Sequence, residues 1–231
     1  MKCRKVKMKL SNHTTSVLKN FATINQNLVI KEGNTIATMS AMKNIVAKAE
    51  VEENFPQEVA ISDLNEFLGA LSLFTSPILE FNDSYVLISE ETKPSTKMKY
   101  FYSDPSVVTS PNKMITMPSE EVKFTMSNED LSKLKRAAGA IGAPDMVLER
   151  EGNTSSITVK DKKNDTANNY SLDVDTSGDG EFNFFFKVEN MKLLDGTYDV
   201  AISSKNISHY KNKSSDIEYW IALEPESTYQ V

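Results

Sequence analysis

The sequence has little cysteine, little histidine and no long apolar run. Cys3 is the only cysteine among the 231 residues, which excludes a disulfide within the chain and is typical of a reducing compartment. With only His13 and His209 as histidines, a zinc site is not expected. No apolar stretch approaches the roughly 18 residues that a membrane helix needs. We therefore expect neither a metal site nor a membrane segment.

Recognisable catalytic motifs are also missing. There is no Gly-rich phosphate loop, no nucleophile elbow and no His-Glu-x-x-His. Residues 173–178 match the start of a calcium-binding loop, but its twelfth position is Phe184 and both flanks have the alternation of strands. A polar hairpin turn through Gly178 and Gly180 fits better. We expect a protein that is not an enzyme and needs no cofactor.

Charge is distributed unevenly along the chain. The net charge is −6, yet residues 1–20 hold six Lys or Arg and no acid. Residues 116–122 and 215–227 are acidic. An acidic protein with local basic patches avoids general adhesion to nucleic acid and keeps attraction where it is needed.

Two stretches of the chain have nearly the same sequence pattern. Residues 6–12 (VKMKLSN) open a stretch that ends at residues 32–35 (EGNT). Residues 122–128 (VKFTMSN) open a second, slightly longer one that ends at residues 151–154 (EGNT). Two copies of a unit of half the chain predict two similar domains.

Each copy begins with a short strand followed by a helix. Ser11 is the expected N-cap of the first helix, and Ser127 with Asp130 forms the expected capping box of the second. Apolar residues recur at helical spacing after each cap. These buried stripes are Thr14, Val17, Leu18, Phe21 and Ile24 in the first copy, and Leu131, Leu134, Ala138 and Ile141 in the second.

The opposite faces of these two helices carry cations and short polar side chains. Asn12, Ser16, Lys19 and Thr23 share one face, and Glu129, Lys133 and Arg136 share the other. An ordinary solvated face explains these residues. On the residues alone that explanation is favoured. The alternative is an arrangement in which equivalent helices present cations to one curved polyanion, with contacts to phosphate and no reading of bases.

The remaining pattern is that of an α+β protein with helices on one face of antiparallel sheets. A further helix is expected at 62–73, capped by Ser62, and a shorter counterpart at 188–194. Prolines at 105, 111 and 118 favour an extended crossing without a helix. The expected organisation is a domain at 1–104, a connector at 105–119 and a domain at 120–231. Strands are expected at 27–31, 35–40, 45–51, 57–61, 78–81, 85–89, 97–102, 145–150, 156–160, 169–174, 182–187, 197–203 and 217–224.

A series of short motifs runs through the chain, and their order and spacing together are specific although no single one is diagnostic. They are LS at 10–11, TT at 14–15, LKNFATIN at 18–25, DLN at 63–65, FLG at 67–69, LSL at 71–73, DPS at 104–106, VVxxPNK at 107–113, FNF at 182–184, NMK at 190–192, ALE at 222–224 and ST at 227–228. In these motifs the chain, from Met8 to Val231, resembles the sliding clamp of tailed bacteriophages, the polymerase processivity factor. Residues 1–7 precede the part that resembles the family, and residues 161–169 and 205–216 match it poorly.

The resemblance implies a two-domain subunit of DNA-clamp type that joins head to tail into a homotrimeric ring around duplex DNA. Helices would line the hole and sheets would form the outer wall. Lys19 and Arg136 would face DNA, with Lys133, Lys135 and Lys192 as secondary contacts. Their neighbours Asn12, Ser16, Asn20 and Thr23 would complete the DNA-facing set.

The same resemblance implies partners. The viral DNA polymerase would bind through a tail peptide in an apolar pocket beside the connector, which we place near Pro105, Val108, Trp220 and Ile221. Trp220 fits core packing equally well. An ATP-driven clamp loader would open the ring, late viral transcription would use it, and the site of action would be the cytoplasm of the infected bacterium.

Two other functions stay open on the residues alone. A single-strand DNA-binding protein is disfavoured because aromatic residues do not interleave with the cations. A virion structural protein built from duplicated β-rich domains would form filaments or shells without DNA.

Overall fold

A computed structural model describes residues 6–111, 113 and 115–230. The chain divides into two compact units, unit 1 at Met1–Asn112 and unit 2 at Lys113–Val231. The division falls inside the segment 105–119 that was expected to connect two domains. Every strand pairing described within either unit is antiparallel.

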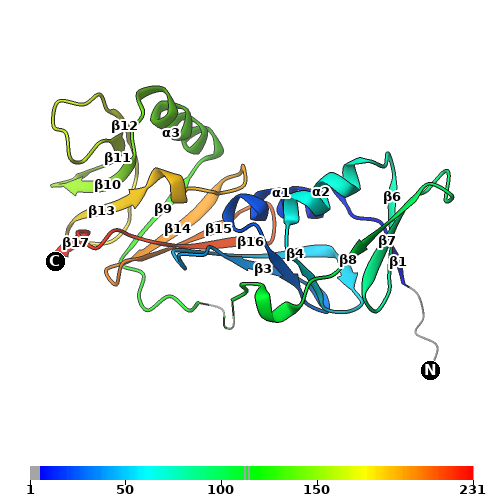
Figure 1. Ribbon diagram of the computed structural model, residues 1–231. Helices are drawn as coiled ribbons and strands as arrows, with labels where there is room; N and C mark the ends of the chain where they lie inside the picture. The colour runs from blue at the N-terminus through cyan, green and yellow to red at the C-terminus, as the bar shows by residue number, and fades with distance from the viewer. Residues whose placement is uncertain (1–5, 112, 114, 231) are drawn as a thin grey trace. The chain divides into compact units, whose positions relative to one another are not determined.

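Unit 1 places two helices against two sets of strands (Figure 1). The first set has the order β1-β6-β7-β8, and the second runs β5-β2-β3-β4. Helix α1 packs on β4 and beside α2. The elements are β1 (Lys7–Met8), α1 (Asn12–Ile24), β2 (Leu28–Ile30), β3 (Gly33–Met39), β4 (Ile45–Phe55), β5 (Val59–Ile61), α2 (Leu64–Ser72), β6 (Pro77–Phe81), β7 (Tyr85–Glu90), β8 (Lys97–Phe101) and the 3-10 turn η1 (Pro105–Val107).

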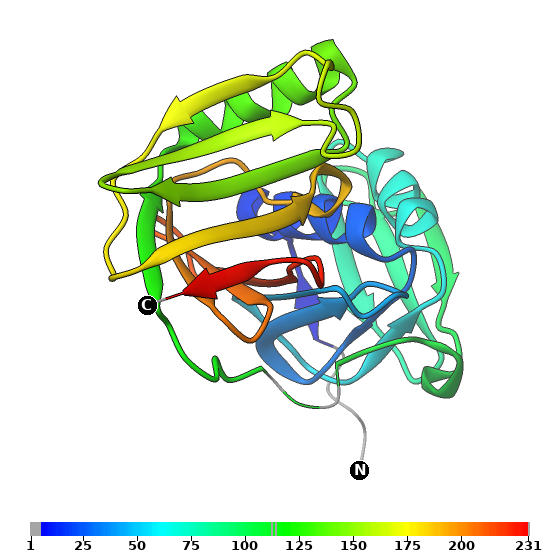
Figure 2. The same ribbon diagram turned by 90° about the vertical axis from the view of Figure 1, so that its left-hand side faces the viewer.

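Unit 2 repeats this plan with one full helix. Its strands form the orders β12-β11-β10-β13-β17 and β16-β15-β14-β9. Figure 2 shows α3 against the first of these sheets, where it contacts β11 and β12. The elements are β9 (Val122–Met126), α3 (Asn128–Ile141), β10 (Asp145–Glu151), β11 (Thr154–Lys160), β12 (Tyr170–Asp173), β13 (Glu181–Lys187), the 3-10 turn η2 (Val188–Asn190), β14 (Tyr198–Ser203), β15 (Ile207–Asn212), β16 (Ile217–Ala222) and β17 (Thr228–Gln230).

The apolar stripe expected on the first helix is buried at every position, and the stripe on the second is buried at three of four. Ile141 is the exception, because α3 ends there and the chain turns away at Gly142. Ser11 Oγ accepts the N–H of Thr14 at 3.1 Å, as the N-cap prediction requires. A helix stripe of this kind is what drives a surface helix onto its sheet.

Three expectations about helices and the connector are wrong. Asp63, not Ser62, caps α2, because its carboxylate accepts the N–H groups of Asn65 and Glu66. The expected helix at 188–194 is only the three-residue turn η2. The connector is not wholly extended, since η1 begins at Pro105, and proline is tolerated in the first turn of a helix.

The second copy's capping box also differs from the expected form. Ser127 Oγ accepts the N–H of Asp130 at 3.0 Å, but the Asp130 carboxylate accepts the Ser127 hydroxyl, at 2.6 Å. In a capping box that carboxylate would accept the backbone N–H of the cap residue. The cap is therefore present, with its reciprocal bond moved to the side chain.

The segment between β12 and β13 turns at Gly178, but the expectation of a hairpin there is wrong, because β12 pairs with β11 while β13 pairs with β10 and β17. Gly178 has φ +100°, and a Cβ there would lie 2.1 Å from the backbone oxygen of Glu121. Only glycine fits a backbone that approaches another backbone so closely. Among the residues that the structure describes, no group of acidic, histidine or cysteine side chains could hold a metal ion.

Candidate nucleic-acid interface

Helix α1 presents a polar outer face. Asn12, Ser16, Lys19 and Thr23 are exposed and Asn20 is half-buried, while the apolar stripe lies beneath them. Asn12 and Lys19 also line a cleft of about 270 Å³ between α1 and α2, together with Lys9, Ser72 and Thr75. All five DNA-facing candidates of this helix therefore lie on one accessible surface.

A buried carboxylate fixes the start of α1. Glu53 on β4 is only 9% exposed, and it accepts hydrogen bonds from the Ser11 N–H and the Thr14 hydroxyl. A negative charge at this end is also attracted to the partial positive charge of the helix N-terminus, which stabilises the helix. β4 therefore sets the position from which α1 carries Lys19.

The three cations of α3 lie in different environments. Arg136 is exposed, and no described residue bonds or ion-pairs with it. Lys133 pairs with Glu129 at 2.6 Å, and this hydrogen bond raises the pKa of Lys133. Lys135 donates to the Leu193 carbonyl at 2.9 Å, and burial lowers the pKa of its ammonium. Of these cations, Arg136 is the one available to an external anion.

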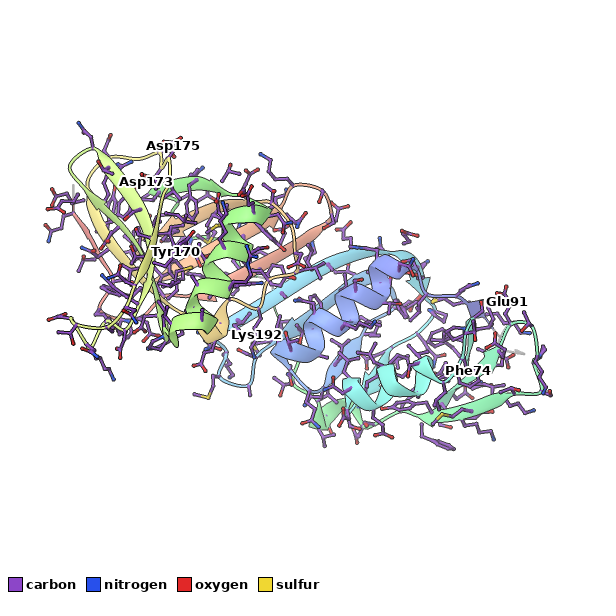
Figure 3. The ribbon with its side chains drawn as sticks, turned by 90° about the horizontal axis from the view of Figure 1, so that it is seen from above. Phe74, Glu91, Tyr170, Asp173, Asp175 and Lys192 are labelled. Atoms are coloured by element: carbon purple, nitrogen blue, oxygen red, sulfur yellow. The ribbon has the colours of Figure 1, made fainter. Side chains whose placement is uncertain are left out.

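Lys192 follows η2 and is half-buried (Figure 3). Its backbone N–H donates to the Asn190 carbonyl at 2.8 Å. It belongs to unit 2 with the α3 cations, but it lies on a different element.

Helices with mixed polar and basic outer faces, repeated in two units of antiparallel sheet, can be compared with known proteins. Residues 9–93 match the family model described as DNA polymerase processivity factor. Residues 123–225 match the model described as gp45 sliding clamp, C terminal. The sliding clamp of Vibrio phage KVP40 is 34% identical over 223 residues, covering 94% of this chain and 99% of that protein.

The chain belongs to the sliding-clamp family.

Other members agree. The sliding clamp of Enterobacteria phage T4 is 32% identical over 231 residues, covering 96% of this chain and 99% of that protein. Among solved structures, proliferating cellular nuclear antigen from Entamoeba histolytica has a TM-score of 0.69 at 16% identity, covering 94% of this chain and 97% of that one. PCNA from Thermococcus kodakaraensis has a TM-score of 0.67 at 14% identity, covering 94% of this chain and 99% of that one. These structures show that the fold is that of a DNA clamp.

The connector of this clamp is attached to unit 1 through Val108. Val108 is 9% exposed and packs in a small apolar cluster with Val29 and Ala60. The Thr109 N–H donates to Asn27 Oδ1 at 3.1 Å, which fixes the chain beside β2. Pro105 is exposed at the start of η1. Val29, Ala60 and Asn27 were not anticipated, and no motif in the sequence singles them out.

The two other pocket candidates, Trp220 and Ile221, belong to β16 of unit 2. Ile221 is fully buried, which fits core packing. Trp220 is 6% exposed and its ring stacks on His209, with centroids 4.8 Å apart. Because Val108 and Trp220 lie in different units, the expected pocket stays a prediction.

Glu53 is the residue at the start of α1 that sequence reasoning missed. Along β4 the core-facing positions alternate, and they are Ile45, Ala47, Ala49, Val51, Glu53 and Phe55. A carboxylate in the phase of buried residues signals a partner inside the fold, since a buried charge needs one. That signal was present in the sequence.

Proposed function

We propose that this chain is the sliding clamp of a phage replication system, a homotrimeric ring that encircles duplex DNA and holds the viral polymerase on its template. The observation that carries the proposal is the match to phage sliding clamps over nearly the whole length of both proteins. The ring would act without chemistry of its own, in the cytoplasm of the infected bacterium. Opening by a clamp-loading ATPase and use in late transcription are part of the same proposal.

The DNA contact would be made by phosphate-directed cations on α1 and α3. Lys19 and Arg136 are exposed, and no described residue pairs with either of them. A ring retains DNA topologically, so these contacts need only be weak. Contacts to phosphate carry no sequence information, which suits a protein that must move along any sequence.

Ring closure would use two strand edges in each copy. β8 pairs only with β7, and β12 pairs only with β11, among the described residues. An uncovered edge strand offers unpaired N–H and C=O groups to another chain. Lys97 and Lys99 on β8 and Asp173 on β12 are exposed and of opposite sign. Head-to-tail pairing of β8 with the β12 of another copy would therefore satisfy both backbone and charge.

The polymerase would dock beside the connector. Val107 is 71% exposed next to the Val108 cluster, so apolar surface is available there to a client peptide. Exposed apolar residues in a connecting segment are typical of binding surfaces.

The decisive test is a double variant, Lys19→Glu with Arg136→Glu. We expect loader-dependent processive synthesis to fall about tenfold or more, because two phosphate contacts per subunit become repulsive. Sedimentation should still show a trimer. The matched control is Lys31→Glu with Lys205→Glu, which changes net charge equally at exposed turns.

Unchanged synthesis by the first variant would remove the DNA-facing assignment alone. A wild-type protein that stays monomeric at high concentration would overturn the ring itself.

A further inference from the structure

Unit 2 contains a groove that neither the DNA contact nor the connector uses. It has a volume of about 750 Å³ and is lined by β9, β14, β15 and the turn after β12. This volume is within the range of pockets that bind ligands. The lining residues are Glu120, Lys123, Phe124, Thr125, Asp175, Thr176, Ser177, Asp199, Val200, Ala201, His209 and Lys211.

The groove crosses the strands, so its floor has two rows of side chains. Ala201 lies opposite Lys123 on one side and opposite His209 on the other. Asp199 likewise lies between Thr125 and Lys211. Ala201 is the small member of its row, and its short side chain leaves the hollow in the middle of the floor.

The wall at one end is held in place by bonds that do not depend on any ligand. Arg150 donates to the Thr176 carbonyl at 2.7 Å and to the Gly178 carbonyl. The Ser177 N–H donates to the Lys123 carbonyl at 2.8 Å. A wall fixed in this way lowers the entropic cost of binding, because little has to be ordered when a ligand arrives.

Most charges in the groove are already paired. Lys123 pairs with Glu120 at 2.6 Å, and Asp199 pairs with Lys213 at 3.1 Å. Two charges are not: no described residue bonds or ion-pairs with the carboxylate of Asp175 or the ammonium of Lys211. Asp175 is at the wall end, where Figure 3 shows it beyond Asp173 and the end of β12. Lys211 is on β15, at the opposite end.

We propose that this groove docks an extended segment of a partner protein that carries a basic residue and, four positions along, an acidic residue. From the segment at Ser177 to β15 there are three strand spacings of about 4.8 Å, or roughly 14 Å. An extended peptide covers that distance in about four residues at about 3.3 Å each. The basic residue meets Asp175 and the acidic residue meets Lys211, which lies in one row with Asp199 and Thr125. An apolar residue between them lies over that row, beside the hollow at Ala201.

The test uses acetyl-Lys-Ala-Val-Ala-Glu-amide, titrated to several millimolar while the backbone amide shifts of Ala201 and His209 are followed. We expect saturable shifts. The affinity should be about fivefold lower for the matched peptides with Lys at both ends or Glu at both ends. Trp220, the only tryptophan, stacks on His209 and gives a second readout by fluorescence. Neither measurement needs DNA or a ring.

Charge reversal at each end makes the test specific. Asp175→Lys should switch the preference to the Glu/Glu peptide, and Lys211→Glu should switch it to the Lys/Lys peptide. The double variant, Asp175→Lys with Lys211→Glu, should again bind the peptide that carries Lys and Glu, in the reverse direction along the groove. Asp83→Lys, an exposed site in unit 1, is the control that should change nothing.

Absence of shifts at Ala201 and His209, or equal affinity for all three peptides, would overturn the proposal. So would single reversals that leave the preference unchanged.

Discussion

The two units each bury one carboxylate among the residues that the structure describes, and they use it differently. In unit 1 Glu53 is 9% exposed and accepts from a backbone N–H and a hydroxyl at the start of α1. In unit 2 Asp145 is 1% exposed and accepts from Lys187 at 2.6 Å and from the Lys162 N–H at 3.2 Å. The first anchors a helix, and the second anchors a loop.

The helices differ as a result. The carboxylate that anchors α1 comes from the sheet, so the outer face of the helix keeps Lys19 unopposed. The acids at the start of α3 are its own Glu129 and Asp130, and Glu129 neutralises Lys133. A count of lysines and arginines therefore overstates the charge that α3 offers. Each helix leaves one exposed cation, Lys19 or Arg136, with which no described residue pairs.

The largest effect should follow Glu53→Ala. It leaves two donors at the start of α1 without an acceptor, which should cost about 2–3 kcal/mol. Hydrogen exchange of the α1 amides would measure it, because that method reports each helix separately.

The α3 amides should keep their protection in this variant. Equal loss in both helices, or no loss in α1, would show that β4 does not anchor the helix.

Asp145→Asn should have the next largest effect. It should lower the free energy of unfolding of unit 2 by about 2 kcal/mol, because two lysines lose a buried charged partner. Desolvation by itself would raise the pKa of Asp145, but the bonds from Lys187 and Lys162 outweigh it, so the pKa is below the ordinary 3.8. A carboxyl group with a lowered pKa stabilises the fold at pH values above its pKa in the unfolded state. This stabilisation is lost as the pH falls through the pKa of the folded state.

Acid unfolding of unit 2, followed by Trp220 fluorescence, should therefore steepen below about pH 4 in the wild type. The Asn variant should lack this component while remaining less stable at pH 7. A variant with the same acid slope as the wild type would contradict the assignment.

Sequence reasoning found α1, α2 and α3 because their buried positions are chemically distinct from their exposed ones. It missed β15 because the core-facing residues of that strand are Ser208, Tyr210 and Asn212, which all carry polar atoms. Their burial depends on partners from other elements, such as the Ile221 carbonyl that accepts from Ser208 at 2.8 Å. No alternation of polarity marks such a strand.

The candidate site was predictable to the same degree. The outer faces of α1 and α3 follow from helical spacing. The neutralisation of Lys133 also follows from helical spacing, since Glu129 lies one turn away. The bond from Lys135 to Leu193 does not, because it joins segments that only the folded chain brings together.

The ends of the helices offer a smaller test. α3 ends at Gly142 with φ +65°, whereas α1 ends at Asn25 in extended backbone at φ −144°. A Cβ at Gly142 would meet nothing within 4 Å, so Gly142→Ala changes only the backbone preference. We expect about 1 kcal/mol of destabilisation in α3 and none in α1. Exchange of the last-turn amides would measure it, and an unchanged α3 would argue against a left-handed cap.

The smallest effect should separate Lys133 from Arg136. Lys133→Ala removes a charge that Glu129 already neutralises, so DNA retention should change less than twofold. Arg136→Ala removes the unopposed charge of α3 and should weaken retention several-fold, more strongly at low salt, because free phosphate contacts are screened by ions. Dissociation of loaded clamps from circular DNA at two salt concentrations would measure both. Glu129→Ala should release Lys133 and increase retention. If Glu129→Ala leaves retention unchanged while Lys133→Ala lowers it as much as Arg136→Ala does, the ion pair opens on DNA and the comparison between α1 and α3 fails.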